Sequence, residues 1–361
     1  MGWSITLGTI RGTAIRMHLT FLLLVGLYAW SGYRLGGPVG AGQAVGLLLA
    51  LFACVLAHEF GHILMAGHYG VRTPDVLLLP IGGVARLERM PDEPRQEFFI
   101  ALAGPLVTLA IVVALYGVIR LTGGVPVIGF RDVGERGFLD ELMRINAWLL
   151  LFNLLPAFPM DGGRVLRSLL AARLGLGRAT RIAASIGQGL AFLMGLVGLT
   201  TGNAILALIG FFIFLGAASE ASAVQTKLQG SGLTVGDMMI TDFRALPRYA
   251  PLRDAVNLLL AGEQREFPVV DHLGAVTGIL TRDLLIKALA DRGPESSVED
   301  AMRGDIAPLA PDLGFEPALE RLRATGLGAL PVVDGRGALV GLLTMDNVTD
   351  LLLVRGALRR A

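Results

Sequence analysis

The stretch Leu47–His62 reads LLLALFACVLAHEFGH, and it decides what kind of protein the first half of the chain makes. Its first part, Leu47–Ala57, is entirely apolar, which is typical of a helix in a lipid bilayer. His58, Glu59 and His62 follow directly. Ionisable groups inside a membrane span are costly and therefore mark functional candidates, so a solvated helix face explains them poorly. An inert polar cluster facing the interior of a helix bundle is the remaining alternative.

The spacing of the two histidines predicts a metal site. On a helix, residues four apart lie on one face and one turn apart, so His58 and His62 can direct two imidazoles at one tetrahedral zinc ion. Glu59 is adjacent to the metal without being a ligand, and its carboxylate can take a proton from an attacking water. A catalytic zinc has three protein ligands, so one ligand must come from elsewhere in the chain.

A second polar motif, Asn153–Gly163, reads NLLPAFPMDGG. Prolines and glycines break helices, and broken backbone at membrane depth is tolerated only where it is buried or lines a wet cavity. His18, His68, His272 and the carboxylates are the candidates for the third ligand, and this motif offers Asp161 to an internal site. The other interpretation is that Asp161 caps a helix predicted at Val165–Leu174.

The composition indicates two parts that face different solvents. The 361 residues are 53% hydrophobic and 17% charged, with a net charge of +1 and a single cysteine. These values exclude a disordered chain and a disulfide scaffold, and the net charge does not favour nucleic-acid binding. Residues 1–224 hold 16 Lys+Arg and 12 Asp+Glu, whereas the shorter segment 225–361 holds 15 and 18. A membrane domain over 1–224 followed by a soluble domain over 225–361 is the simplest interpretation.

Apolar stretches in the first part predict about six membrane spans. The last stretch is long enough for two spans that turn at Thr200–Asn203, and the fourth is the least regular because it runs into prolines. The predicted stretches are Met17–Tyr33, Gly40–Val71, Phe98–Ile119, Ile145–Met160 and Ile182–Ser219.

Arginine counts predict the orientation, because basic residues collect on the cytoplasmic side. With the N-terminus inside, eleven arginines fall in inside segments and five in outside loops, and six spans return the C-terminus to the cytoplasm. The expected location is thus the cell membrane, multi-pass, with both termini cytoplasmic. The inside arginines are Arg11, Arg16, Arg72, Arg86, Arg89, Arg95, Arg164, Arg167, Arg173, Arg178 and Arg181, and the outside ones Arg34, Arg120, Arg131, Arg136 and Arg144.

The soluble part repeats itself at an offset of 63 residues: Phe267–Asp271, FPVVD, matches Leu330–Asp334, LPVVD, and Gly278–Asp283, GILTRD, matches Gly341–Asp346, GLLTMD. Each copy predicts a helix, a short strand, a turn, a second strand and a helix, which makes a small α/β unit. The pattern resembles a tandem pair of CBS domains, with repeats at about 233–292 and 296–356.

The CBS resemblance implies an adenine nucleotide (ATP, ADP or AMP) as a regulatory ligand, with Thr281, Asp283, Thr344 and Asp346 as the nucleotide-binding residues. It also implies a homodimer formed through the CBS domains. A hydroxyl and a carboxylate at a helix start can bind a diol, and free backbone N–H groups attract phosphate. The alternative is structural, because Thr is a good N-cap and Asp in the first turn offsets the helix dipole.

The His-Glu-x-Gly-His motif of Leu47–His62, followed by Asn153–Gly163, resembles the site-2 protease family of intramembrane zinc metalloproteases over residues 10–220. The resemblance implies one zinc ion held by His58, His62 and Asp161, with Glu59 as catalytic base. Asn153 would orient the substrate or support the oxyanion. Ala103-Gly-Pro105 also matches a family pattern and is expected to serve helix packing.

The same resemblance implies that the segment Val76–Leu87, which contains Gly82 and Gly83, forms a β-loop that grips an extended substrate. The alternative is an ordinary connector.

The expected function is intramembrane proteolysis near the cytoplasmic side of the bilayer, modulated by nucleotide. Substrates would be membrane proteins such as an anti-sigma factor, a membrane-bound transcription factor or a pro-protein. The alternatives are a CBS-regulated transporter or channel and a catalytically silent scaffold. A transporter should line a path with intramembrane charges, whereas here the ionisable groups gather in two motifs, and a silent scaffold has no need of Glu59.

Overall fold

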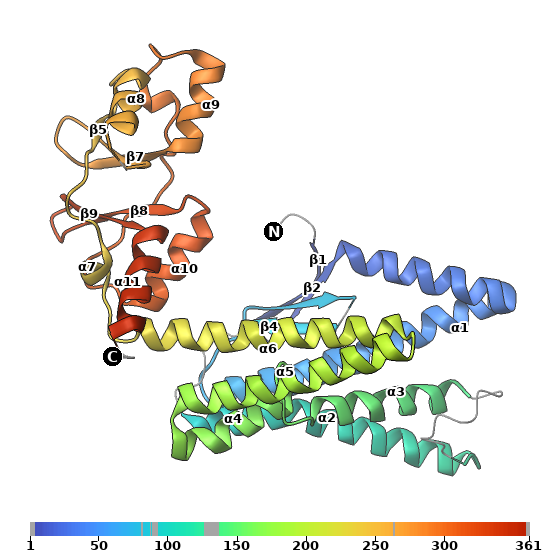
Figure 1. The fold of residues 1–361 in the computed structure, drawn as a ribbon. Coiled ribbons are helices and arrows are strands. Elements are labelled where there is room, and N and C mark those ends of the chain that lie inside the picture. Colours follow the sequence, from blue (N-terminus) through green and yellow to red (C-terminus); the bar gives the residue numbers. More distant parts are fainter. Residues whose placement is uncertain are drawn as a thin grey trace. The chain divides into compact units, whose positions relative to one another are not determined.

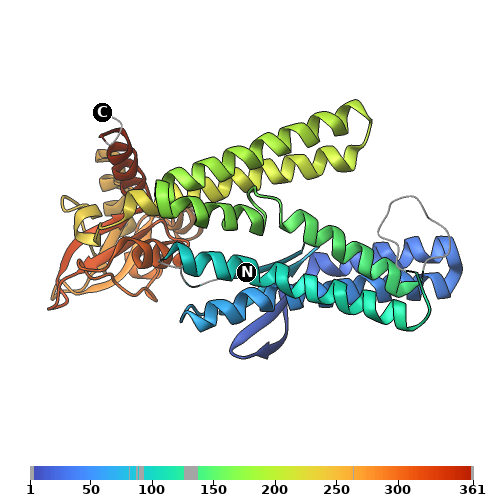
Figure 2. The ribbon, with the colours of Figure 1, turned by 90° about the horizontal axis from the view of Figure 1, so that it is seen from below.

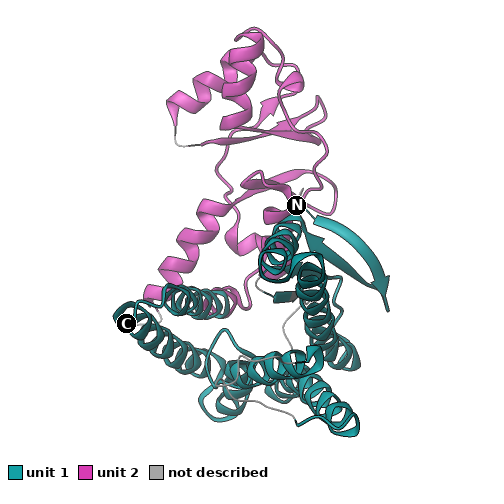
Figure 3. Ribbon diagram, turned by 90° about the vertical axis from the view of Figure 1, so that its right-hand side faces the viewer, with its two compact units in different colours: residues 1–224 teal, residues 225–361 magenta. Residues whose placement is uncertain are grey.

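The computed structural model describes residues 4–80, 82–86, 88, 93–125, 137–262 and 264–358. Three arginines counted for the orientation, Arg89, Arg131 and Arg136, lie outside these residues, as do Ile81 and Leu87 of the predicted β-loop. The chain divides into two compact units, Met1–Val224 and Gln225–Ala361 (Figure 3). Each unit has its own hydrophobic core.

The first two predicted spans form one element, α1 (Leu19–His68), which folds back on itself as a hairpin (Figure 1). The helical geometry is interrupted at Gly36 and Gly37, and Gly37 has a φ of 60°, which favours glycine. The two arms approach closely at Gly32, where an added Cβ would meet the carbonyl oxygen of Gly40, so only glycine fits there. His18 is the N-cap of α1, and its Nδ1 accepts a hydrogen bond from the Thr20 N–H at 3.3 Å.

The remaining helices of the first unit are α2 (Pro94–Leu121), α3 (Phe138–Asn153), α4 (Asp161–Leu174), α5 (Leu176–Thr200) and α6 (Ala204–Gly230). Among the described residues, α1, α2, α5 and α6 are long and apolar enough to cross a membrane. The predicted turn at Thr200–Asn203 is confirmed, and α5 and α6 run side by side beyond it (Figure 2). The bounds of the predicted fourth span were wrong: α3 ends at Asn153, because Pro156 and Pro159 follow.

A four-stranded sheet belongs to the same unit, and only half of it was predicted. Its strands are β1 (Ser4–Ile10), β2 (Thr13–His18), β3 (Asp75–Leu79) and β4 (Gly82–Arg86), in the order β1-β2-β3-β4. The β3–β4 hairpin confirms a β-loop in the segment around Gly82 and Gly83, whereas nothing in the sequence analysis indicated β1 and β2. Strand β4 is an edge strand, so one side of its backbone pairs with no strand among the described residues.

The second unit contains the two predicted copies. The first copy comprises α7 (Val235–Met238), β5 (Leu246–Pro247), α8 (Leu252–Ala261), β6 (Glu266–Val270), β7 (Val276–Thr281) and α9 (Arg282–Arg292). A 3-10 turn (Val298–Asp300) leads into α10 (Phe315–Thr325), β8 (Ala329–Val333), β9 (Leu339–Thr344) and α11 (Met345–Leu358). The repeated Asp has a structural role, because Oδ1 of Asp271 and of Asp334 each accepts two backbone N–H bonds in the turn between paired strands.

Candidate active site

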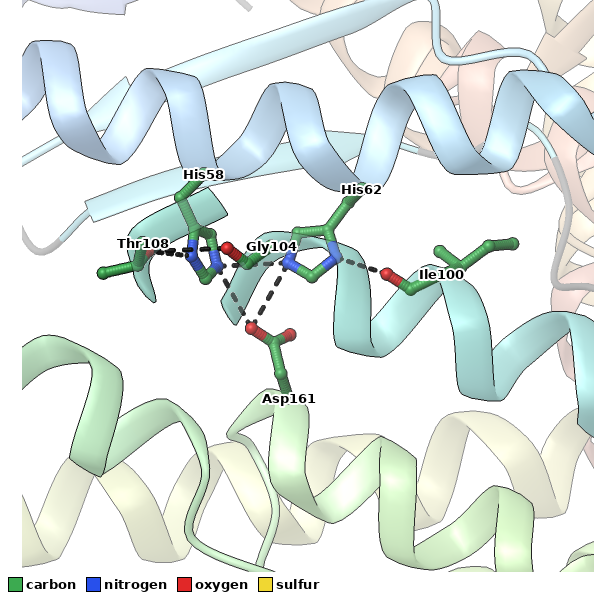
Figure 4. A network of polar contacts seen from close by, with 6 residues as sticks. All are labelled: His58, His62, Ile100, Gly104, Thr108 and Asp161. Carbon is green, nitrogen blue, oxygen red and sulfur yellow. Dashed lines mark hydrogen bonds and ion pairs between the residues drawn. The ribbon is translucent and has the colours of Figure 1, made fainter. Parts of the chain in front are cut away.

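Three side chains from two distant parts of the chain converge between α1, α2 and α4 (Figure 4). The Nε2 atoms of His58 and His62 lie 3.1 Å apart. Oδ2 of Asp161 lies 3.1 Å from the first and 3.2 Å from the second. Both histidines are buried, at 8% and 9% exposure. The helix α1 provides the i, i+4 pair, and the start of α4 directs Asp161 at the same point.

This donor set fits a zinc ion. Two imidazole nitrogens and one carboxylate oxygen are ligands that zinc commonly takes in catalytic sites. Tetrahedral coordination with bonds near 2.1 Å puts ligand atoms about 3.4 Å apart, close to the separations of these three atoms. Among the described residues these three are a group able to hold a metal ion. With three protein ligands, one tetrahedral position stays open for water or substrate.

Two groups on α2 contact the Nδ1 atoms of the imidazoles, on the ring side away from the metal site. Nδ1 of His58 lies 2.8 Å from the Thr108 hydroxyl, and Nδ1 of His62 lies 2.7 Å from the Ile100 carbonyl oxygen (Figure 4). A carbonyl accepts only, so Nδ1 of His62 carries the proton and its Nε2 lone pair is free for a metal. The sequence analysis did not identify Thr108 as a residue of the site. The feature that could have indicated it is a hydroxyl group within the otherwise apolar stretch Phe98–Ile119.

Gly104 lets α2 approach the two histidines. A Cβ built at this position would overlap Nε2 and Cε1 of His62 and would come within 2.7 Å of Nε2 of His58. The motif Ala103-Gly-Pro105 therefore serves helix packing in a specific way: Gly104 leaves room for the imidazole atoms that face the metal site. Gly61 of the histidine motif similarly packs against the Ala103 carbonyl.

A cavity of about 350 Å³ opens onto these ligands. Glu59 lines it, as do Asn153 and the edge-strand residues Gly82 and Gly83. A Cβ at Gly83 would lie 2.7 Å from Cγ of Glu59, so the strand backbone passes directly beside this carboxylate. The structure thus brings together every residue that the sequence analysis placed at the metal and substrate site.

A buried ion-pair network positions the start of α4. Arg167 is 2% exposed; its Nε donates to Glu97 of α2 at 2.7 Å, and its Nη1 donates to Glu220 of α6 at 3.0 Å. Its guanidinium lies 4.9 Å from the ring centroid of Phe158, in the loop just before Asp161. Arg167 belongs to α4, and its guanidinium ties this helix to the Phe158 loop, to α2 and to α6. These contacts help to fix Asp161, at the start of α4, opposite the histidines.

Replacing Thr108 with valine is expected to weaken zinc binding about 10- to 100-fold while preserving side-chain shape. Valine cannot accept the hydrogen bond of His58, which then loses its fixed orientation. Competition with a chelator measures the affinity. Thr200→Val is the matched control, because among the described residues the Thr200 hydroxyl bonds to the Leu196 and Val197 carbonyls of its own helix. Equal zinc affinities for Thr108→Val and the wild type would contradict this role.

The second unit contains a separate cavity of about 940 Å³, lined by residues of both copies. Thr344 and Asp346 are among them, together with Glu266 and Arg265. Burial raises the pKa of the Glu266 carboxyl above its usual range, and the neighbouring Asp346 carboxylate raises it further.

The four predicted nucleotide-binding residues are not equivalent. Thr281 and Asp283 are not among the residues lining this cavity. Both threonines also serve as N-caps, because Oγ1 of Thr281 accepts from the Leu284 N–H at 3.4 Å and Oγ1 of Thr344 accepts from the Asn347 N–H at 3.1 Å.

Comparison with known proteins identifies both parts. Residues 46–135 and 130–196 match the model of peptidase family M50, and residues 235–291 and 298–354 match that of the CBS domain. The chain is 32% identical to a zinc metalloprotease of Methanocaldococcus jannaschii over 354 residues, 96% of each chain. It is 32% identical to the Rip3 protein of Mycobacterium tuberculosis, over 97% of this chain and 93% of that protein. The solved site-2 protease of M. jannaschii is 37% identical, covering 61% of this chain and 95% of that one with a TM-score of 0.47.

Proposed function

The chain belongs to peptidase family M50 and is a zinc metalloprotease with a CBS pair, and from this premise we propose that His58, His62 and Asp161 hold its zinc ion while Glu59 is the general base. The observation that supports this proposal most directly is the mutual approach of the three donor atoms within 3.2 Å inside a cavity that Glu59 also lines. The test is the variant Glu59→Gln, which should keep zinc and lose cleavage. The family assignment favours a protease over the transporter or channel alternative.

In the proposed mechanism a bound zinc ion supplies Lewis acidity, which acidifies water and polarises the scissile carbonyl. The Glu59 carboxylate removes a proton from the attacking water and then delivers it to the leaving amine. Asn153, at the end of α3, offers a carboxamide that can donate to the developing oxyanion. Thr108 and the Ile100 carbonyl keep the two imidazoles in place throughout.

The edge strand β4 is proposed to present the substrate. A protease needs an extended backbone at the scissile bond, and an edge strand supplies hydrogen bonds to such a backbone. Residues Gly82 and Gly83 of β4 line the cavity beside Glu59. A peptide paired with this edge therefore passes in front of the general base.

The proposed setting is the cell membrane, crossed by six spans with both termini in the cytoplasm. Four apolar helices, one of them the α1 hairpin with two arms, account for five of these spans, and α3 is proposed as the sixth. Cleavage would then take place near the cytoplasmic side of the bilayer. The substrates would be membrane proteins of the anti-sigma factor, membrane-bound transcription factor or pro-protein type.

The CBS pair is proposed to bind an adenine nucleotide that modulates cleavage, and to join two chains as a homodimer. The cavity between the two copies, with Thr344 and Asp346 in its lining, supports nucleotide binding. At this cavity the Asp346 carboxylate is placed to accept hydrogen bonds from a ribose diol. The same cavity does not include Thr281 and Asp283, so the second copy is the stronger candidate.

Replacing Asp346 with alanine is expected to weaken nucleotide binding about 10- to 100-fold, which corresponds to losing a charge-assisted hydrogen bond. Calorimetry of the detergent-purified full chain with ATP, ADP and AMP measures this. The matched variant Asp283→Ala, in the other copy, should change affinity much less. If none of the three nucleotides binds the wild type, or if the two variants behave alike, this assignment is wrong.

A further inference from the structure

Helix α3 presents a second carboxamide to the catalytic cavity. Asn146, Leu149 and Asn153 all line the cavity that contains Glu59. Their spacing of three and four residues places them on one face of the helix. Asn146 is 1% exposed and lies in an otherwise apolar stretch. Nothing in the reaction described above uses it.

Strand β4 lines the same cavity through Gly82, Gly83 and Ala85. The lining therefore includes two unlike elements that both offer polar groups. One is the edge strand β4, whose backbone pairs with no strand on one side among the described residues. The other is a face of α3 that carries two carboxamides, Asn146 and Asn153.

An extended peptide in this cavity needs hydrogen bonds on both of its sides. Its N–H and C=O groups point alternately toward each side, so pairing with β4 satisfies only half of them. At membrane depth there is too little water to satisfy the rest, and leaving them unpaired is costly. A carboxamide is suited to this task because it offers both a donor and an acceptor, like a backbone amide.

Asn146 has hydrogen-bonding capacity left for such a ligand. Its Nδ2 donates to the Leu142 carbonyl at 2.8 Å, and its side chain shares a hydrogen bond with Cys54. Nδ2 is the donor to Cys54 as well, so both of its protons are used, whereas Oδ1 keeps its lone pairs and has no partner within the described part of the chain. The bond to Leu142 fixes the orientation of the carboxamide in advance.

We propose that Asn146 is a substrate-binding residue whose carboxamide pairs with the bound peptide backbone about three residues from the point where Asn153 contacts it. The two asparagines are seven positions apart, which corresponds to a rise of about 10 Å along α3. Three residues of an extended chain span the same length, about 10 Å. The inference rests on the proposed function, because it assumes that the cavity holds the substrate.

Peptide hydroxamates of two lengths test this contact without knowledge of the natural substrate. A hydroxamate binds the zinc ion, so the peptide attached to it extends from the metal along the cavity. For the wild-type chain we expect a five-residue peptide to bind about tenfold more tightly than a two-residue peptide. In Asn146→Leu this gain should disappear, while affinity for the two-residue peptide and zinc content stay unchanged.

Two further variants separate a contact with substrate from a structural role. Asn146→Ala repeats the test with a side chain that cannot overfill the site, and Leu149→Val changes a neighbour on the same helix face. Only the two Asn146 variants should lose the length-dependent gain. If both keep it, the inference is overturned although the proposed function stands. If neither peptide binds the wild type, the proposed metal and substrate site fails, and the inference fails with it.

Discussion

Replacing Glu59 with glutamine is expected to lower the rate of peptide cleavage by roughly 10²- to 10⁴-fold, while the purified protein still carries zinc. Glutamine has nearly the same shape as glutamate, so its contact with the backbone of Gly83 is retained. It cannot take a proton at neutral pH, however, and proton transfer to the leaving amine is lost. His58, His62 and Asp161 are unchanged, so the metal should remain bound.

Two measurements check this result. Elemental analysis gives the zinc content of each purified chain. Quantitative proteomics then compares membranes from cells that produce the wild type with membranes from cells that produce Glu59→Gln, and cleaved fragments should be missing only from the latter. Glu320→Gln, an exposed position in the second unit, is the control for the substitution itself. Normal cleavage by Glu59→Gln would remove this residue as the general base.

Replacing Gly104 with alanine is expected to abolish stoichiometric zinc binding, and cleavage with it. The added methyl group would occupy the space of the two imidazole edges that face the metal. Such a clash acts on the ligands directly, so the loss should exceed the 10- to 100-fold typical of changes behind a ligand. Relief of the clash requires α2 to move away from α1, which also separates Thr108 from His58.

The matched control is Gly117→Ala on the same helix. A Cβ at Gly117 would meet no atom within 4 Å, so alanine there should leave zinc binding intact and favour the helix by up to about 1 kcal/mol. Zinc content and thermal unfolding of both variants distinguish a local clash from a general loss of stability. Full zinc occupancy in Gly104→Ala would show that the close approach of α2 is not required.

Local sequence patterns were sufficient wherever neighbouring residues determine the outcome. The i, i+4 spacing of His58 and His62 follows from helix periodicity alone. The turn between α5 and α6 was predictable because a polar interruption separates two long apolar runs. The two copies of the second unit were visible because identical residues recur at a constant offset, and the structure adds a reason for the repeated Asp, whose side chain closes the same turn in both.

Patterns failed where a feature depends on a distant segment or competes with a stronger local signal. Strands β1 and β2 were missed because they depend on a distant segment: β2 pairs with β3, which follows only after the whole of α1. The predicted fourth span extended past Asn153 because hydropathy continues across Pro156, while the backbone cannot remain helical there.

Hydropathy and helical period are local properties, so the amino-acid sequence was enough to separate a membrane part from a soluble part and to place two histidines and a glutamate on one intramembrane helix. Whether Asp161, 103 residues after His58, meets the imidazoles or only caps a helix depended on how the helices pack, and the structure brings it to the imidazoles. The same packing places Thr108, Gly104 and Asn146 at the site. A single polar or small residue in an apolar helix has no local mark of its partner, since that partner is set by how the helices pack.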